Sequence, residues 1–273
     1  MHKFNRLPIQ EINNSKNELE LIDKTHILGK YNSFISTVFG IMKSLNLNKE
    51  NSVILEAGSN LIGDSKIYFL SPAVGYFFAN NPSIIDYFGF DNSVHENYFP
   101  LIKEQIEDNK KKCSYIISKD EMLENMKKQM IFSYESFQQK KEEIDKSGKN
   151  SVIISSFVLG STFDCEKHFK NNFWNMSQSL QINRFALDDF VKNYIDEQEH
   201  NFVAKTPYIE SEYREYIINE MTTFSKKYLK SEQDRISFLE KRLKEKYSMN
   251  EHYKIFDCPF EEGCSIAVSN TLK

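Results

Sequence analysis

Residues 53–63 read VILEAGSNLIG, and this stretch decides the fold class. The run Ser52–Glu56 is rich in β-branched and apolar residues, which predicts a strand. Glu56 closes that strand and Gly58 opens the turn after it. Because glycine has no side chain, the backbone of such a turn can approach a ligand closely. The stretch predicts a strand and a ligand-binding turn that leads into a helix, with an ordinary strand-to-helix turn as the alternative.

A second strand is expected at Ile84–Asp91, and the sequence there ends in FGFDNS, residues 88–93. An acid at the end of a strand can accept hydrogen bonds from both hydroxyls of a ribose, and Asp91 is placed for this role. The alternative is that Asp91 caps the following helix together with Asn92 or Ser93.

The most strand-like run is Ser151–Leu159, whose nearly unbroken apolar character is typical of a strand buried on both faces. Strand and helix patterns alternate around it. The expected elements are a helix at Asp64–Phe78 interrupted by Pro72, a helix at Val94–Asp108, a strand at Cys113–Ile117 and a long helix at Asp120–Lys146. The alternation predicts an α/β fold: a Rossmann-like, mainly parallel sheet with helices on both faces. Leu180–Phe185 and Asn201–Lys205 both remain candidates for the fifth strand.

The two ends of the chain add helices and a hairpin to this sheet. Glu18–Leu47 and Glu210–Tyr247 have helical spacing, the second with a break near Ser231. His252–Phe256 and Ser265–Asn270 predict a C-terminal antiparallel hairpin. We therefore expect an N-terminal helical cap over residues 1–50. The α/β domain is expected over residues 51–273, with a helical insertion at about 208–247.

Four of these segments, taken in order, resemble the class I S-adenosylmethionine-dependent methyltransferases. They are the glycine turn, the FGFDNS segment, the run at 151–159 and the terminal hairpin. Two residues depart from the family pattern: Asn60 stands where the family has a glycine, and Ser151 stands where it has an acid. The resemblance implies S-adenosylmethionine as cofactor. The residues that it places at the cofactor are Glu56, Gly58, Ser59, Gly63, Asp91, Asn92, Ser155, Ser156 and Phe157.

A narrower resemblance is to the histamine N-methyltransferase family, through residues 29–34, 63–71 and 134–136. It implies that Tyr31 lies near the cofactor and Asp64 near a substrate amine. The same class of fold often builds a substrate wall after its fourth strand, and this makes Phe173 and Trp174 candidate pocket residues. No catalytic residue is singled out, because methyl transfer needs mainly placement and desolvation of the acceptor.

Composition restricts the partners. The chain has 273 residues and a net charge of −4, which disfavours nucleic acid as a partner. It has no apolar run long enough to span a membrane and no secretory signal, so we expect a cytoplasmic protein. The four cysteines lack zinc-type spacing, and no metal site is expected. The oligomeric state is left open.

These features together predict methyl transfer from S-adenosylmethionine to a small-molecule acceptor, with an amine as one candidate. The alternative is a catalytically silent member of the fold that works as a binding or interaction subunit. A third interpretation, a nucleotide-dependent oxidoreductase, is disfavoured because the chain has no GxGxxG phosphate-binding motif.

Overall fold

The structure is a computed structural model, and it describes ten stretches of the chain. These are residues 6–22, 28–58, 70–90, 124–125, 128–131, 133–156, 178–186, 231–247, 252–259 and 263–272. The described helices are α1 (Ile9–Ile22), α2 (Leu28–Ser44), α3 (Leu70–Asn80), α6 (Tyr134–Lys146) and α10 (Glu232–Tyr247). The described strands are β1 (Ser52–Ala57), β2 (Asp86–Phe90), β3 (Met130–Ile131), β4 (Asn150–Ser156), β5 (Ser179–Ala186), β6 (Tyr253–Asp257) and β7 (Cys264–Asn270).

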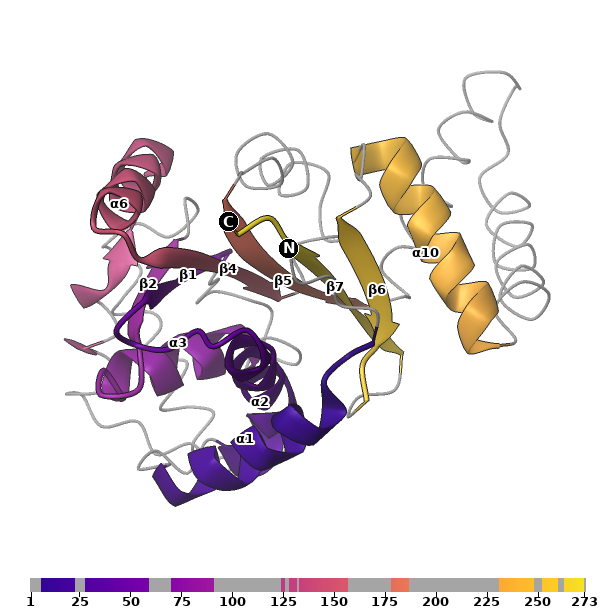
Figure 1. Cartoon of the computed structure of the whole chain (residues 1–273), viewed down its shortest axis with the longest axis horizontal. Helices are drawn as coiled ribbons and strands as arrows, with labels where there is room; N and C mark the ends of the chain where they lie inside the picture. Colours follow the sequence, from indigo (N-terminus) through magenta and orange to yellow (C-terminus); the bar gives the residue numbers. More distant parts are fainter. Residues whose placement is uncertain are drawn as a thin grey trace, which may run out of the picture.

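The described strands form one sheet of seven strands in the order β3-β2-β1-β4-β5-β7-β6 (Figure 1). Strands β1 to β5 are parallel to one another, and β7 is antiparallel to both β5 and β6. The predicted α/β class, the central position of β1 and the antiparallel terminal pair are confirmed. Of the two candidates for the fifth strand, Leu180–Phe185 is the one that pairs with β4, while Asn201–Lys205 lies outside the described residues.

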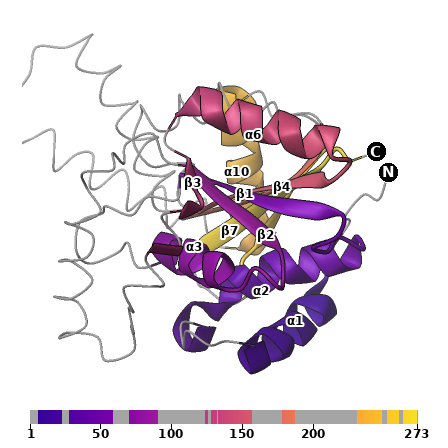
Figure 2. The same ribbon diagram turned by 90° about the vertical axis from the view of Figure 1, so that its left-hand side faces the viewer.

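Helices cover both faces of the sheet. Figure 2 shows α6 and α10 on one side and α1, α2 and α3 on the other. The α2–α3 face buries Ile54, Val152, Ile182 and Ile266 of the sheet, and α1 packs mainly on α2. The α6–α10 face buries the alternate strand positions, as the period of two in a strand requires. Nearly every position of β1 and β4 is therefore buried, which is the pattern expected for central parallel strands.

One predicted helix is divided in the structure. The helix expected at Asp120–Lys146 is not continuous: β3 occupies Met130–Ile131, and α6 begins only at Tyr134. Ser133 starts α6, because its hydroxyl accepts a hydrogen bond from the backbone N–H of Ser136. The prediction of one long helix followed the charged residues on either side of Ser133 and overlooked this N-cap. The predicted strand at Cys113–Ile117 lies outside the described residues.

The first helical region was also predicted with the wrong bounds. Glu18–Leu47 was expected as one mostly helical stretch, whereas the chain forms α1 and α2 with undescribed residues 23–27 between them. Pro72 does not interrupt its helix, because it lies in the first turn of α3, where a backbone N–H has no partner within the helix. The break expected near Ser231 coincides with the start of α10, where Ser231 and Asp234 cap each other.

Candidate functional site

The strand order places the candidate site at the carboxyl ends of β1 and β4. From β1 the chain continues to β2 and β3 on one side, and β4 and β5 lie on the other. Ligands of open parallel sheets bind at such a reversal of strand order, where the connections on the two sides diverge and leave a crevice. The carboxyl ends of β2 and β5 flank this position.

Gly58 forms the turn at the end of β1. Its φ is +70°, in the left-handed region that other residues enter only at a cost, and its N–H donates a 2.9 Å hydrogen bond to the carbonyl of Phe90. This bond extends the β1–β2 pairing by one step beyond Ala57 and Phe90. The turn is therefore fixed to the end of β2, and Asp91 is the next residue of the chain after that anchor.

Glu56 is fully buried two residues before the turn. By strand alternation its side chain points to the α2–α3 face, where it accepts a hydrogen bond from the hydroxyl of Tyr87 on β2. The ring of Tyr87 stacks on Phe78 of α3 with a centroid separation of 5.9 Å. The carboxylate of Glu56 is thus held in one orientation by a side chain that is itself packed in place.

Ser155 and Ser156 end β4 and point to opposite faces of the sheet. On the α6–α10 face, the hydroxyl of Ser155 donates a 2.8 Å hydrogen bond to Oδ1 of Asn183 on β5, and both residues are buried. The Nδ2 of Asn183 has no hydrogen-bond partner among the described residues. This leaves a buried donor close to the carboxyl edge, at the position that pairs with Ser155.

Ser156 and Arg184 are paired across β4 and β5 on the opposite face. Arg184 is 2% exposed, and its guanidinium carbon lies 5.6 Å from the ring centroid of Phe34 on α2. Burial lowers the pKa of Arg184 from its ordinary value, while the neighbouring thiols of Cys264 and Cys258 act in the opposite direction. A cation is therefore held in the interior, one strand away from β4.

Of the residues predicted at the cofactor, the structure brings Glu56, Gly58, Ser155 and Ser156 together at the carboxyl ends of β1 and β4. Tyr31 lies on α2, one turn before Phe34, although its side chain is not described. The other predicted site residues are outside the described residues: Ser59, Gly63, Asp64, Asp91, Asn92, Phe157, Phe173 and Trp174.

Tyr87, Asn183 and Arg184 were not predicted from the sequence. A signal existed for the last two, because an amide and a cation interrupt the apolar run of residues 180–186, and charged residues are rarely buried without a partner. Tyr87 gave no such signal, since an aromatic residue in a strand is common.

Within the described stretches, no three His, Cys, Asp or Glu side chains converge as a metal site would require. None of the helices in those same stretches combines the length and the apolar character that crossing a membrane demands.

A scan against protein-family models finds none that matches this chain, and a search of curated protein sequences finds no match.

Proposed function

We propose that this protein binds S-adenosylmethionine at the carboxyl ends of β1 and β4 and transfers its methyl group to a small-molecule acceptor. The observation that carries the proposal is the Gly58 turn, bonded to the end of β2 at the reversal of strand order. A ligand above this turn meets backbone rather than side chain, and the segment after β2 starts with Asp91.

The residues present fit an adenosine-containing cofactor. A buried carboxylate, Glu56, and a buried hydroxyl, Ser156, lie on one face of the sheet beside the turn. Such groups suit the amino and hydroxyl groups of the cofactor, because a buried polar ligand needs partners for its hydrogen bonds. Asp91 supplies the acceptor for the ribose hydroxyls under this proposal.

The sheet also favours methyl transfer over the oxidoreductase alternative. The common dinucleotide-binding order is 3-2-1-4-5-6, whereas this sheet inserts the antiparallel β7 between β5 and β6. An antiparallel terminal pair is the ending that the resemblance to class I methyltransferases implies. The chain also lacks the GxGxxG motif that holds a pyrophosphate.

S-adenosylmethionine supplies a methyl group on a positively charged sulfur, which a lone pair of the acceptor can attack directly. The protein then has to hold the acceptor in line and exclude water. Under this proposal α2, which carries Tyr31, closes the α2–α3 side of the site, and Asp64, Phe173 and Trp174 contact the acceptor. An amine is the acceptor class to test first, because an acid and aromatic rings both attract a cation.

The experiment is calorimetric titration with S-adenosylmethionine and S-adenosylhomocysteine, using two matched variants. Asp91 follows the carboxyl end of β2, and Asp86 lies at the amino end of the same strand. Asp91→Ala should weaken cofactor binding by about 1–3 kcal/mol, the cost of unpaired polar groups. Asp86→Ala should leave the affinity unchanged, since Asp86 pairs with Lys149 away from the site.

The two outcomes separate the candidate functions. If the protein binds neither compound, the catalytically silent alternative replaces methyl transfer. If it binds both and Asp91→Ala binds equally well, the ribose does not contact Asp91. The protein with bound cofactor would then be screened for methyl transfer to small amines, phenols and carboxylates, with the Asp64→Asn variant tested beside the parent. Methyl transfer to RNA, DNA or a protein alone would refute the small-acceptor part of the proposal.

A further inference from the structure

Cys258 and Cys264 face each other across the β6–β7 hairpin. The register of the two strands pairs Asp257 with Ser265, and the next pair outward is Cys258 with Cys264. The N–H of Cys258 donates a 2.9 Å hydrogen bond to the carbonyl of Cys264, which continues the ladder to this pair. Both side chains belong to the core on the α2–α3 face, so they point to the same side.

The backbone spacing of such a pair suits a disulfide. Directly opposed residues of an antiparallel ladder have Cα atoms roughly 4.5–5.5 Å apart, and disulfides bridge Cα atoms roughly 4.4–6.8 Å apart. Both residues are reduced in the structure. They are 9% and 8% exposed, so a reagent that reaches them must be of low molecular weight.

Arg184 adds a charge to this pair. Arg184 lies on β5, directly beside the strand that carries Cys264, and its guanidinium interacts electrostatically with both thiols. A neighbouring cation favours the thiolate of a cysteine, and the thiolate is the form that attacks a disulfide. Two opposed thiols and one cation therefore lie together between β5, β6 and β7.

We propose that Cys258 and Cys264 form a reversible dithiol–disulfide couple in which Cys264, on the strand beside that of Arg184, is the attacking sulfur. This couple requires an oxidant, and its class is a small-molecule disulfide such as glutathione disulfide. The Cys264 thiolate attacks one sulfur of the oxidant, the S–S bond breaks and one glutathione thiolate leaves. Cys258 then attacks the mixed disulfide at the sulfur of Cys264 and expels the second glutathione thiolate.

The balance closes over the two steps. The two protein sulfurs are oxidised to one disulfide, the glutathione disulfide is reduced to two thiols, and the two protons of the protein thiols pass to the departing thiolates. No metal or other co-reactant takes part.

The first test uses a monoaryl trivalent arsenical, which binds two thiols only when they lie close together. The variant with Cys113→Ser and Cys165→Ser keeps only the proposed pair and should bind one arsenical per chain with the loss of two thiols. The variant with Cys258→Ser and Cys264→Ser should bind none. The proposal fails if the first variant, folded by circular dichroism, binds none.

The second test is equilibration of the first variant over a series of glutathione redox ratios, followed by peptide mass spectrometry. We expect one disulfide, between residues 258 and 264, which forms and is lost reversibly in the folded protein. Its absence at every ratio would overturn the proposal, as would its appearance only in denaturant.

The third test separates the two sulfurs. In the background that lacks Cys113 and Cys165, Cys258→Ser leaves Cys264 alone, and Cys264→Ser leaves Cys258 alone. Cys264 should react with a small disulfide about tenfold faster than Cys258, because β7, which carries Cys264, lies directly beside the strand of Arg184, while β6 lies one strand further away. Arg184→Gln should remove that difference. Equal rates with Arg184 in place would refute Cys264 as the attacking sulfur, even if the glutamine variant did not fold.

Discussion

Gly58 meets two separate demands, one of conformation and one of space. Its φ of +70° costs other residues about 1–2 kcal/mol, although asparagine tolerates it better. The absence of a side chain also allows a ligand to approach the backbone of the turn, where the cofactor is proposed to lie. Substitutions that differ in only one of these properties can distinguish the two demands.

We predict that Gly58→Ala lowers the free energy of unfolding by about 1 kcal/mol, because alanine is strained at this φ. Gly58→Asn should lower it by less. Both variants should lose affinity for S-adenosylmethionine, since each adds a side chain above the turn. Urea denaturation and calorimetry measure the two effects. Full affinity in the asparagine variant would show that the ligand does not approach this backbone.

Tyr253 couples stability to pH. Burial raises the pKa of its hydroxyl above the ordinary value, with a smaller opposing contribution from a hydrogen bond to Ser269. The hydroxyl also donates a 2.6 Å hydrogen bond to Gln181 on β5. Above about pH 10 the unfolded chain releases this proton while the folded protein keeps it. The stabilisation is therefore complete below pH 10 and is lost as the pH rises beyond it.

We accordingly predict that, as the pH rises above about 10, stability falls more steeply in the parent than in Tyr253→Phe. The phenylalanine variant keeps the ring but has no proton to lose. Chemical denaturation across that range measures both slopes, and the other tyrosines affect parent and variant alike. Parallel curves would rule out Tyr253 as the source of the steeper slope.

At the scale of elements, the close packing of α1 on α2 depends on one glycine. A Cβ built on Gly40 of α2 would lie 2.5 Å from the backbone N and Cα of Ile12 on α1. Because backbone atoms cannot rotate away, any side chain at this position must push the two helices apart. Ile12, Ser15 and Leu19 form the buried stripe of α1 at this contact.

We predict that Gly40→Ala lowers the free energy of unfolding by about 1–3 kcal/mol, the usual range for overpacking, despite the higher helix propensity of alanine. Asn13→Ala is the matched control, because Asn13 is exposed on α1 and gains the propensity without the clash. Thermal unfolding of the three proteins decides between them. A Gly40→Ala protein as stable as the control would mean that α1 can shift at no cost.

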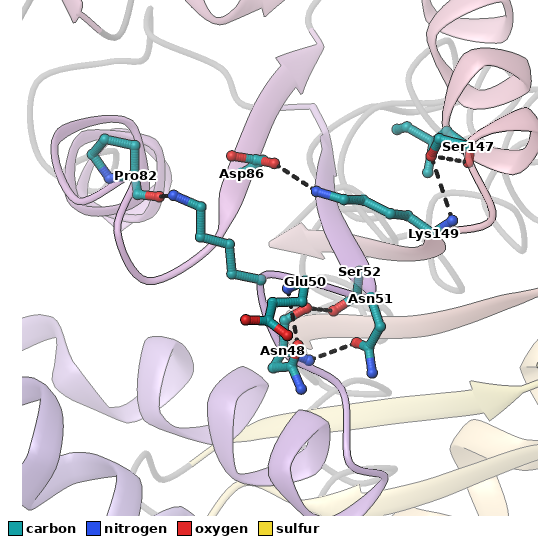
Figure 3. Close-up of polar contacts among 10 residues, drawn as sticks. Asn48, Glu50, Asn51, Ser52, Pro82, Asp86, Ser147 and Lys149 are labelled. Atoms are coloured by element: carbon teal, nitrogen blue, oxygen red, sulfur yellow. Dashed lines mark hydrogen bonds and ion pairs between the residues drawn. The ribbon is translucent and has the colours of Figure 1, made fainter.

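A network of polar contacts lies at the amino ends of β1, β2 and β4, opposite to the carboxyl ends where the site is proposed (Figure 3). Asn51 Oδ1 accepts a 2.8 Å hydrogen bond from the N–H of Asn48, and the Asn51 carbonyl accepts one of 2.7 Å from the N–H of Asn150. Lys149 and Asp86 form an ion pair at 2.9 Å between the starts of β4 and β2. These contacts align the strand starts and lie far along the strands from Gly58.

We predict that Asn51→Ala destabilises the protein by about 1–2 kcal/mol, because it removes the acceptor for the N–H of Asn48 and the donor to the carbonyl of Asn46. Affinity for S-adenosylmethionine should be unchanged in the folded variant. Calorimetry well below the unfolding temperature checks this. Weakened binding would place the ligand site nearer the amino ends of the strands than we propose.

The elements that the sequence predicted best are those with strong local patterns. β1 and β4 each contain three consecutive β-branched or leucine residues, at 53–55 and 152–154, which is typical of central strands, so both strands were predicted. The last residues of the predicted run, 157–159, lie outside the described residues. β3 has only two described residues and therefore no period to detect. The residues at the carboxyl ends of β1 and β4 followed from the strand ends, whereas the contact of Tyr87 with Glu56 depends on the pairing of β1 with β2, which a linear pattern does not contain.

The position of β7 has a consequence for how the protein is made. β7 lies between β5 and β6, yet β6 precedes it along the chain. On the ribosome β6 emerges first and has no described neighbour to pair with until Cys264–Asn270 follows. At about 5–20 residues per second this interval is on the order of one second. During it β5 and β6 each present an open edge of the kind that recruits other chains. A nascent chain halted before Cys264 would leave β6 without its partner among the described strands, so the seven residues of β7 are what joins β6 to the sheet.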